Sequence, residues 1–395
     1  MHLLLFDIDG VLVEARGYLR ALQDTVAHFS HQMGVGSHPP TEAEVRALEA
    51  NGLTSEWDSA PTCVAVLLLQ RLRRMPSLRL PAAWPEALSM LGNHPCALPH
   101  PDYAAVAQRV GAYRRAGLAA AETARAALWD EARSDTALQD HLPALSALLE
   151  DLLGHTHDFY RAPLTRHFQH RAIGSQMVAA TYDIAPDFDS PAYLTQFDQP
   201  LLSTAVRQRL SAAAATGRVR MALYTARPSL PPADTQEPHK GYSPEAELAR
   251  SLVGLEDTPL IGLGRMAWLA RRVGERVERL VKPSPVQALA AAGAACSGQE
   301  GHALEAAWAL YRDDGLQPPL ADLRRPVLHV FEDAASGLEA VGRAAAMLGA
   351  AGLAADWRPY GIAPVDGPKA AALTARNAPI YPSVNEAIMA ALAAL

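Results

Sequence analysis

Residues 3–12, LLLFDIDGVL, combine an apolar run with two aspartates and a glycine. Residues 2–6 form a nearly continuous apolar run, which is typical of a strand buried on both faces of a parallel sheet. The run ends at Asp7, and Asp9 and Gly10 follow, so we expect the strand to lead into a loop. Ligands of open α/β sheets bind beyond the carboxyl ends of the strands. The two aspartates therefore mark a candidate functional site.

Asp7 and Asp9 lie two residues apart, so their side chains can point the same way at the strand end. Carboxylates this close repel each other unless they share a cation or a proton. Mg²⁺ prefers oxygen ligands and would relieve the repulsion. An aspartate can also act as a nucleophile through an aspartyl-phosphate, with a neighbouring carboxylate as acid and base. The alternative is a turn with two solvated carboxylates.

Other apolar runs resemble the first one. They lie at 219–224 and 327–331, with a weaker candidate at 360–363. The first two are followed by turn residues and then by Ala- or Leu-rich helical stretches, which predicts an α/β fold with a Rossmann-like, doubly wound parallel sheet. We expect long loops at 228–244 and 291–326.

Polar residues accompany these predicted strands. Thr225 follows the second run, the pair Glu332-Asp333 ends the third, and Lys282 precedes a helix start that contains prolines. Taken alone, Thr225 fits a helix cap, Lys282 a surface lysine, and the acidic pair an exposed turn. Their order along the chain favours one shared site.

In this order the four elements resemble the four motifs of the haloacid dehalogenase (HAD) superfamily. Residues 6–13, FDIDGVLV, are similar to the first motif of the family. Glu332-Asp333 followed by Gly337 has the form of the fourth motif in β-phosphoglucomutase-like members, which carry a C1 cap. The resemblance covers the sheet elements, in residues 1–14 and 203–395.

The resemblance implies a role for each motif residue. Asp7 would attack phosphorus, and Asp9 would protonate the leaving oxygen and later activate water, with its backbone carbonyl on the metal. Thr225 would hold a phosphoryl oxygen, and Lys282 would pair with the nucleophile and the phosphate. The cofactor would be Mg²⁺, and its ligands would be Asp7, Asp9, Glu332 and Asp333.

The aspartate at position 9 favours phosphate-ester chemistry, because family dehalogenases and phosphonate-cleaving members lack it. We therefore expect a Mg²⁺-dependent phosphatase acting on a small phosphorylated metabolite. A phosphomutase of the β-phosphoglucomutase type remains an alternative. The two activities differ in whether the cap excludes water from the active site, which the sequence does not show. A non-catalytic binding or regulatory protein on a HAD scaffold is the other alternative, and retention of the motif residues argues against it.

Between Leu12 and about Leu202 the strand pattern disappears and apolar residues recur at helical spacing. We expect a large helical cap at 15–202, inserted after the first strand of a catalytic core formed by 1–14 and 203–395. Thr41 and Glu44 have the form of a capping box. The predicted helices are 18–33, 41–50, 60–75, 103–116, 119–133 and 138–160.

The expected cap also offers candidates for substrate binding. The segment 51–58, NGLTSEWD, places polar groups around a tryptophan and resembles a Gly-x-x-Asn-Asp-Trp-type segment of some C1-capped phosphatases. A helix N-cap at Ser55 or Ser59 is the alternative. Arg16 could bind an anion or be solvated. The substrate-binding candidates are Arg16, Thr54, Ser55, Trp57 and, next to the second motif, Arg227.

The composition limits the classes of partner that the chain is expected to bind. The 395 residues carry 35 basic and 42 acidic side chains, a net charge of −7, which disfavours nucleic acid and anionic membranes. No apolar run approaches the roughly 20 residues that cross a bilayer. Three cysteines far apart indicate neither a disulfide framework nor a cysteine metal site. We expect a cytoplasmic protein, and the oligomeric state stays open.

Overall fold

The computed structural model describes residues 1–113 and 118–395. The chain divides into two units. The first comprises residues 1–15, 179–184 and 197–395, and the second comprises residues 16–178 and 185–196. Relative to the predicted core and cap, the first unit additionally includes residue 15 and the segments 179–184 and 197–202.

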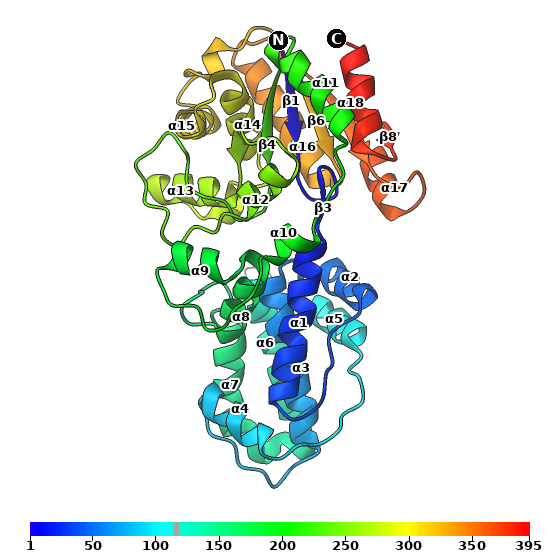
Figure 1. Cartoon of the computed structure of the whole chain (residues 1–395), viewed down its shortest axis with the longest axis vertical. Helices are drawn as coiled ribbons and strands as arrows, with labels where there is room; N and C mark the ends of the chain where they lie inside the picture. The colour runs from blue at the N-terminus through cyan, green and yellow to red at the C-terminus, as the bar shows by residue number, and fades with distance from the viewer. Residues whose placement is uncertain (114–117) are drawn as a thin grey trace. The chain divides into compact units, whose positions relative to one another are not determined.

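The first unit contains a six-stranded parallel sheet, as the apolar runs predicted. β1 (His2–Phe6) lies between β4 and β6 in the order β5-β4-β1-β6-β7-β8 (Figure 1). The other strands are β4 (Val219–Tyr224), β5 (Leu260–Ile261), β6 (Val327–Glu332), β7 (Asp356–Ile362) and β8 (Ile380–Tyr381). Sequence reasoning missed β5 and β8, because two-residue strands leave no periodic pattern.

Helices cover both faces of this sheet. Leu3 and Leu5 of β1 pack into one apolar cluster, and Leu4 and Phe6 pack into the other, because successive side chains of a strand point to opposite faces. All four are fully buried, which explains why β1 is apolar throughout. The first cluster includes residues of α13 (Leu263–Val273), α14 (Pro285–Ser297), α15 (Glu300–Tyr311), α16 (Ala335–Ala350) and α17 (Pro368–Thr374); the second includes residues of α11 (Thr204–Ala215), α12 (Glu245–Leu252) and α18 (Val384–Ala393).

A short two-stranded ribbon marks both ends of the helical insertion. β2 (Val13–Glu14) pairs antiparallel with β3 (Gln199–Pro200). The loop between β1 and β2 closes on itself, because the Gly10 amide donates to the carbonyl of Val13 at 2.9 Å. The ribbon therefore holds the Asp9 loop and the chain around residue 199 side by side within the first unit.

The described residues of the second unit form helices joined by loops, and none of them forms a strand. The predicted capping box is confirmed, since the Thr41 hydroxyl accepts from the Glu44 amide and the Glu44 carboxylate accepts from the Thr41 amide. The apolar run at 64–69 lies in α3, which packs against α1, α6, α7 and α8. The helices that lie wholly or partly in this unit are α1 (Arg16–Gln32), α2 (Glu42–Ala50), α3 (Glu56–Arg73), α4 (Trp84–Gly92), α5 (Tyr103–Ala112), α6 (Ala120–Ser134), α7 (Leu142–Leu153), α8 (Pro163–Ile173), α9 (Ser175–Tyr182) and α10 (Tyr193–Phe197).

Two predictions of local structure were wrong. The helix expected over 138–160 is a 3₁₀ turn (Thr136–His141) followed by α7, because Pro143 lacks an amide proton and restarts the helix in its first turn. The loop expected over 291–326 is largely the end of α14 and all of α15, joined at Gly298, whose φ of 76° ends α14. Residues 114–116 of one predicted helix lie outside the described residues.

None of the helices in the described part of the chain is long and apolar enough to span a bilayer.

The core of the second unit contains a histidine that stays neutral. His167 of α8 stacks on His28 and Phe188, with ring centroids 4.2 and 4.5 Å away. Burial, with the nearby charges of His28 and Arg171, lowers its pKa from 6.5 to about 2. The unfolded chain binds this proton from pH 6.5 downward, whereas the folded chain does so only near pH 2. Stability therefore falls as the pH drops below 6.5.

We predict that His167→Phe makes stability less sensitive to acid. Phenylalanine retains the aromatic stack and has no proton to gain, so the wild type loses up to about 1.4 kcal/mol more per pH unit below pH 6.5. Urea unfolding at pH 7, 6 and 5, followed by circular dichroism, measures the difference. His94→Phe is the control because His94 is exposed. Parallel stability profiles for wild type and His167→Phe would refute the assignment.

Candidate active site

The motif residues meet at one edge of the sheet. Asp7 follows β1, Thr225 follows β4, Glu332 ends β6 and Asp333 comes next. Because β4, β1 and β6 are adjacent and parallel, their carboxyl ends share an edge. The structure thus brings together the strand-end residues that the sequence predicted.

Lys282 connects two of these carboxylates. Its ammonium lies 3.0 Å from Asp7 Oδ1 and 2.6 Å from Glu332 Oε1. The Tyr224 hydroxyl donates to the same Glu332 oxygen at 2.5 Å, and the ammonium lies 3.9 Å from the centre of the Tyr224 ring. The Lys282 and Asp7 side chains are only 11% and 12% exposed, and that of Glu332 is fully buried. One cation therefore balances two largely desolvated anions.

Burial dominates the electrostatics of the cluster. It raises the pKa of Asp7 well above its ordinary value; Lys282 counteracts this effect, and Glu332, Asp333 and Asp9 reinforce it. Burial also raises the pKa of Glu332, against the opposing influence of Lys282 and Tyr224. Although burial disfavours the ammonium, Asp7 and Glu332 hold the pKa of Lys282 above its ordinary value. The site has more negative charge than Lys282 alone neutralises.

This arrangement fits a divalent cation. Asp7, Glu332 and Asp333 each offer a carboxylate oxygen, and these atoms lie within 4.8 Å of one another. Glu332 Oε2 is buried without a hydrogen-bond partner among the described residues. All the donors are hard oxygens, which Mg²⁺ prefers. The Asp9 side chain is not in this group, so its predicted part in metal binding rests on its backbone carbonyl.

Two glycines leave room for these carboxylates. A Cβ at Gly10, whose φ is +71°, would collide with the carboxylate of Asp333. A Cβ at Gly337, in the first turn of α16, would collide with the carboxylate of Glu332. The close approach explains why both positions are glycine. Lys369, which sequence reasoning missed, forms an ion pair of 2.5 Å with Asp333.

Hydrogen bonds to the backbone and the hydroxyl of Thr225 fix its position. Its amide donates to the carbonyl of Ile261 at 3.1 Å, and its hydroxyl accepts from the Arg227 amide at 3.2 Å. The buried amide of Gln287 donates to the carbonyls of Thr225 and Ile261 at 2.9 and 3.0 Å and accepts from the Lys282 amide at 3.3 Å. Gln287 thus fixes Thr225 relative to Lys282. Only the structure identifies it, because a glutamine in an alanine-rich helix carries no pattern.

Arg227 binds acidic side chains. Its Nη2 lies 2.6 Å from Asp9 Oδ1 and 2.9 Å from Asp198 Oδ2. The Arg227 side chain is 1% exposed. Its contact with substrate stays a prediction, and in this structure its guanidinium is engaged by two carboxylates.

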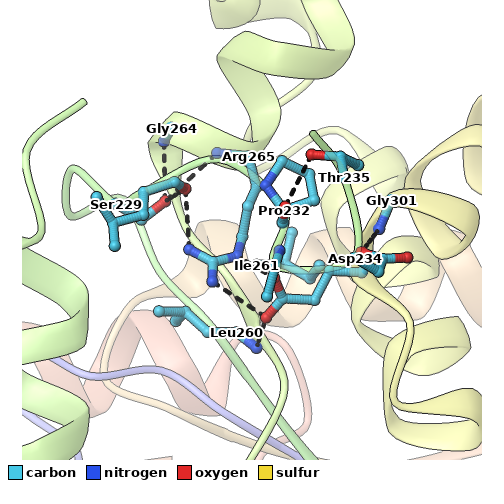
Figure 2. Close-up of polar contacts among 12 residues, drawn as sticks. Ser229, Pro232, Asp234, Thr235, Leu260, Ile261, Gly264, Arg265 and Gly301 are labelled. Carbon is cyan, nitrogen blue, oxygen red and sulfur yellow. Dashed lines mark hydrogen bonds and ion pairs between the residues drawn. The ribbon is translucent and has the colours of Figure 1, made fainter. Parts of the chain in front are cut away.

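A second buried arginine anchors the segment that follows Thr225 and Arg227. Arg265 of α13 binds Glu300 at 2.7 Å and Glu247 at 2.5 Å. Figure 2 shows the Ser229 hydroxyl facing the start of α13, where it accepts from the amides of Gly264 and Arg265 at 3.1 and 3.3 Å. The same figure shows Asp234 accepting from the Gly301 amide, at 2.7 Å. These contacts tie the segment 228–244 to α13 and α15.

The remaining candidates belong to the second unit. Ser55 is the N-cap of α3, accepting from the Trp57 amide at 3.3 Å, so the capping alternative is realised. Trp57 lies beside His157, with ring centroids 5.4 Å apart. Thr54 and Arg16 are exposed, and Arg16 is the first residue of α1. Their roles in substrate binding stay predictions.

Comparisons with known proteins support the fold. No family model and no curated protein matches the chain. A crystal structure from the Northeast Structural Genomics Consortium has a TM-score of 0.61 at 14% identity, covering 98% of this chain and 97% of that one. Two other structures align less closely. They are a putative β-phosphoglucomutase from Thermotoga maritima (TM-score 0.38, 16% identity, all of both chains) and a phosphatase from Thermococcus thioreducens (TM-score 0.39, 14% identity, 90% of this chain and 91% of that one).

The first of these likenesses shows that the fold occurs in another protein across nearly the whole chain. The parallel sheet with helices on both faces confirms the predicted α/β fold, and the helical unit is inserted after its first strand.

We predict that Lys282→Met destabilises the protein by about 3 kcal/mol at pH 7 without divalent cations, because it leaves two buried carboxylates without their cation. The deficit shrinks at pH 5, where Asp7 and Glu332, whose pKa values burial raises, take up protons. Urea unfolding in EDTA measures both values. Adding Glu332→Gln should recover part of the loss at pH 7. A deficit that is equal or larger at pH 5 would contradict this account.

Proposed function

We propose that this chain is a HAD-superfamily phosphatase that hydrolyses a small phosphomonoester with Mg²⁺. The observation that carries the proposal is the setting of Asp7. This carboxylate lies at the carboxyl end of the central strand, beside a buried lysine and two further carboxylates. A nucleophile, a fixed cation and hard oxygen ligands at one point are what phosphoryl transfer requires.

The proposed reaction has two steps. A carboxylate oxygen of Asp7 attacks phosphorus, a phosphorus–oxygen bond forms to Asp7, and the bond to the leaving oxygen breaks as Asp9 gives that oxygen a proton. Asp9 then takes a proton from water, whose oxygen attacks the same phosphorus and releases phosphate from Asp7. Lys282 offsets charge on Asp7 and on the phosphoryl oxygens, and Thr225 binds one of those oxygens.

Asp7, Glu332 and Asp333 would hold the metal, together with the backbone carbonyl of Asp9. Bound Mg²⁺ would supply positive charge against the negative charge of the phosphoryl oxygens. We propose that the helical second unit selects the substrate, with Arg16, Thr54, Ser55 and Trp57 as its candidate contacts. The substrate class is a small phosphorylated metabolite.

We predict that Asp7→Asn lowers the hydrolysis of p-nitrophenyl phosphate by on the order of a thousandfold or more, because the nucleophile is lost. Released nitrophenol and free phosphate are measured with Mg²⁺ and with EDTA, and EDTA should abolish the wild-type activity. Asp366→Asn, at an exposed aspartate of the same unit, is the control. Full activity of Asp7→Asn would refute the assignment. Sugar-phosphate isomers without free phosphate would indicate a phosphomutase.

We predict that Lys369 competes with Mg²⁺ for Asp333. Lys369→Met should lower the Mg²⁺ concentration that gives half-maximal activity about three- to fivefold, the size expected from an ion pair that is partly exposed. Asp333→Asn should raise it. Lys240→Met removes a comparable exposed Lys–Asp pair, that with Asp183, and is the matched control. Stabilisation by Mg²⁺ in thermal unfolding provides a second readout. Equal Mg²⁺ requirements in Lys369→Met and Lys240→Met would contradict the prediction.

A further inference from the structure

We propose that Arg227 and Asp198 are positioning residues for Asp9. Asp198 fixes the guanidinium of Arg227, and the guanidinium fixes the carboxylate that exchanges protons with the leaving group and with water. This inference rests on the proposed function, because it assigns partners to the acid and base of that reaction.

The contacts are short and directional. Asp9 Oδ1 accepts from Nε and Nη2 of Arg227 at 2.9 and 2.6 Å, and Oδ2 accepts from Nε alone at 3.0 Å. Nη2 also donates to Asp198 Oδ2 at 2.9 Å. A guanidinium is planar, so contacts with both Asp9 oxygens set the plane of that carboxylate as well as its position.

Exposure falls along the series of three side chains. The Asp9 side chain is 39% exposed, that of Arg227 1%, and that of Asp198 is fully buried. The residue that must meet substrate and water is therefore the accessible one, and the two behind it are shielded. This is the arrangement expected of a reacting group supported by side chains that do not react.

Backbone contacts restrain the segments that carry Asp9, Arg227 and Asp198. Arg227 lies two residues after Thr225, and its amide donates to the Thr225 hydroxyl. Asp198 directly precedes β3, and β3 pairs with β2, which follows the Asp9 loop. The ribbon therefore restrains the backbone near Asp9 and Asp198, and the Thr225 hydroxyl restrains the backbone of Arg227.

The contacts with Arg227 differ between the two carboxylate oxygens of Asp9. Two donors hold Oδ1, whereas a single, longer contact holds Oδ2. We assign Oδ2 as the atom that gives a proton to the leaving oxygen and receives one from water. Loss of Arg227 would let the carboxylate rotate, which costs turnover rather than substrate affinity.

The test compares Asp198→Asn, Arg227→Lys, Arg227→Gln and the Asp198→Asn/Arg227→Gln double variant in p-nitrophenyl phosphate hydrolysis with saturating Mg²⁺. We expect kcat to fall by about tenfold in Asp198→Asn and by up to about a hundredfold in Arg227→Gln, with KM unchanged. Arg227→Lys should retain more activity than Arg227→Gln. Because Asp198 acts through Arg227, the double variant should match Arg227→Gln alone.

Glu247→Gln is the matched control, because Glu247 is likewise one of two carboxylates on a buried arginine, Arg265. It should reduce stability in urea as Asp198→Asn does and leave kcat unchanged. Guanidine at millimolar concentration should restore part of the activity of Arg227→Ala and none to Asp9→Asn. This rescue remains informative if Asp198→Asn folds poorly.

Equal kcat in Asp198→Asn and Glu247→Gln, additive losses in the double variant, or a loss confined to KM would each overturn the positioning role. In those cases the loss of activity in Asp7→Asn would leave the proposed function intact. A folded wild type without Mg²⁺-dependent turnover would refute the proposed function and this inference together.

Discussion

The interaction on which the site depends is the placement of one lysine between two buried carboxylates. Lys282 contacts Asp7 and Glu332 at the carboxyl edge of the central strands, where little water reaches the charges. Desolvating a carboxylate costs several kcal/mol unless it is paired. Lys282 offsets the cost of desolvating both carboxylates, and Tyr224 donates a further hydrogen bond to Glu332. The negative charge that Lys282 does not balance would favour a divalent cation at this edge.

Other parts of the first unit hold Lys282 and the carboxylates in position. The apolar strands β1, β4 and β6 fix the distances between the motif residues, and Gly10 and Gly337 allow the carboxylates to approach. Gln287 links the Thr225 loop to the backbone of Lys282. Each of the two buried arginines binds two carboxylates. Arg227 binds Asp9 and Asp198, and Arg265 binds Glu247 and Glu300, which anchor the segment after Arg227.

Sequence reasoning could predict the sheet and the strand-end residues because both follow from local pattern. The apolar run before Asp7 and Asp9 predicts a strand, and the two aspartates predict that the site lies at its carboxyl end. The order of the motifs predicts that Thr225 and Glu332 belong to the same site. It could not predict Asp198, Tyr224 or Gln287, because nothing adjacent in the sequence distinguishes them. Their importance comes from contacts across 29, 108 and 62 residues of chain. The helices of the second unit were predicted from periodicity, whereas a proline in the first turn of α7 and a glycine after α14 moved the boundaries.

If Asp7 is the nucleophile, it becomes phosphorylated during turnover. The most direct measurement is peptide mass spectrometry on protein mixed with a phosphate ester and Mg²⁺ and quenched in acid, which preserves an acyl phosphate. With p-nitrophenyl phosphate, whose leaving group needs no proton, we expect phosphate on the peptide that contains Asp7, at greater occupancy in Asp9→Asn, where water is not activated, and none in Asp7→Asn. Turnover with phosphate on another residue, or with no phosphorylated peptide in the wild type and in Asp9→Asn, would contradict the account.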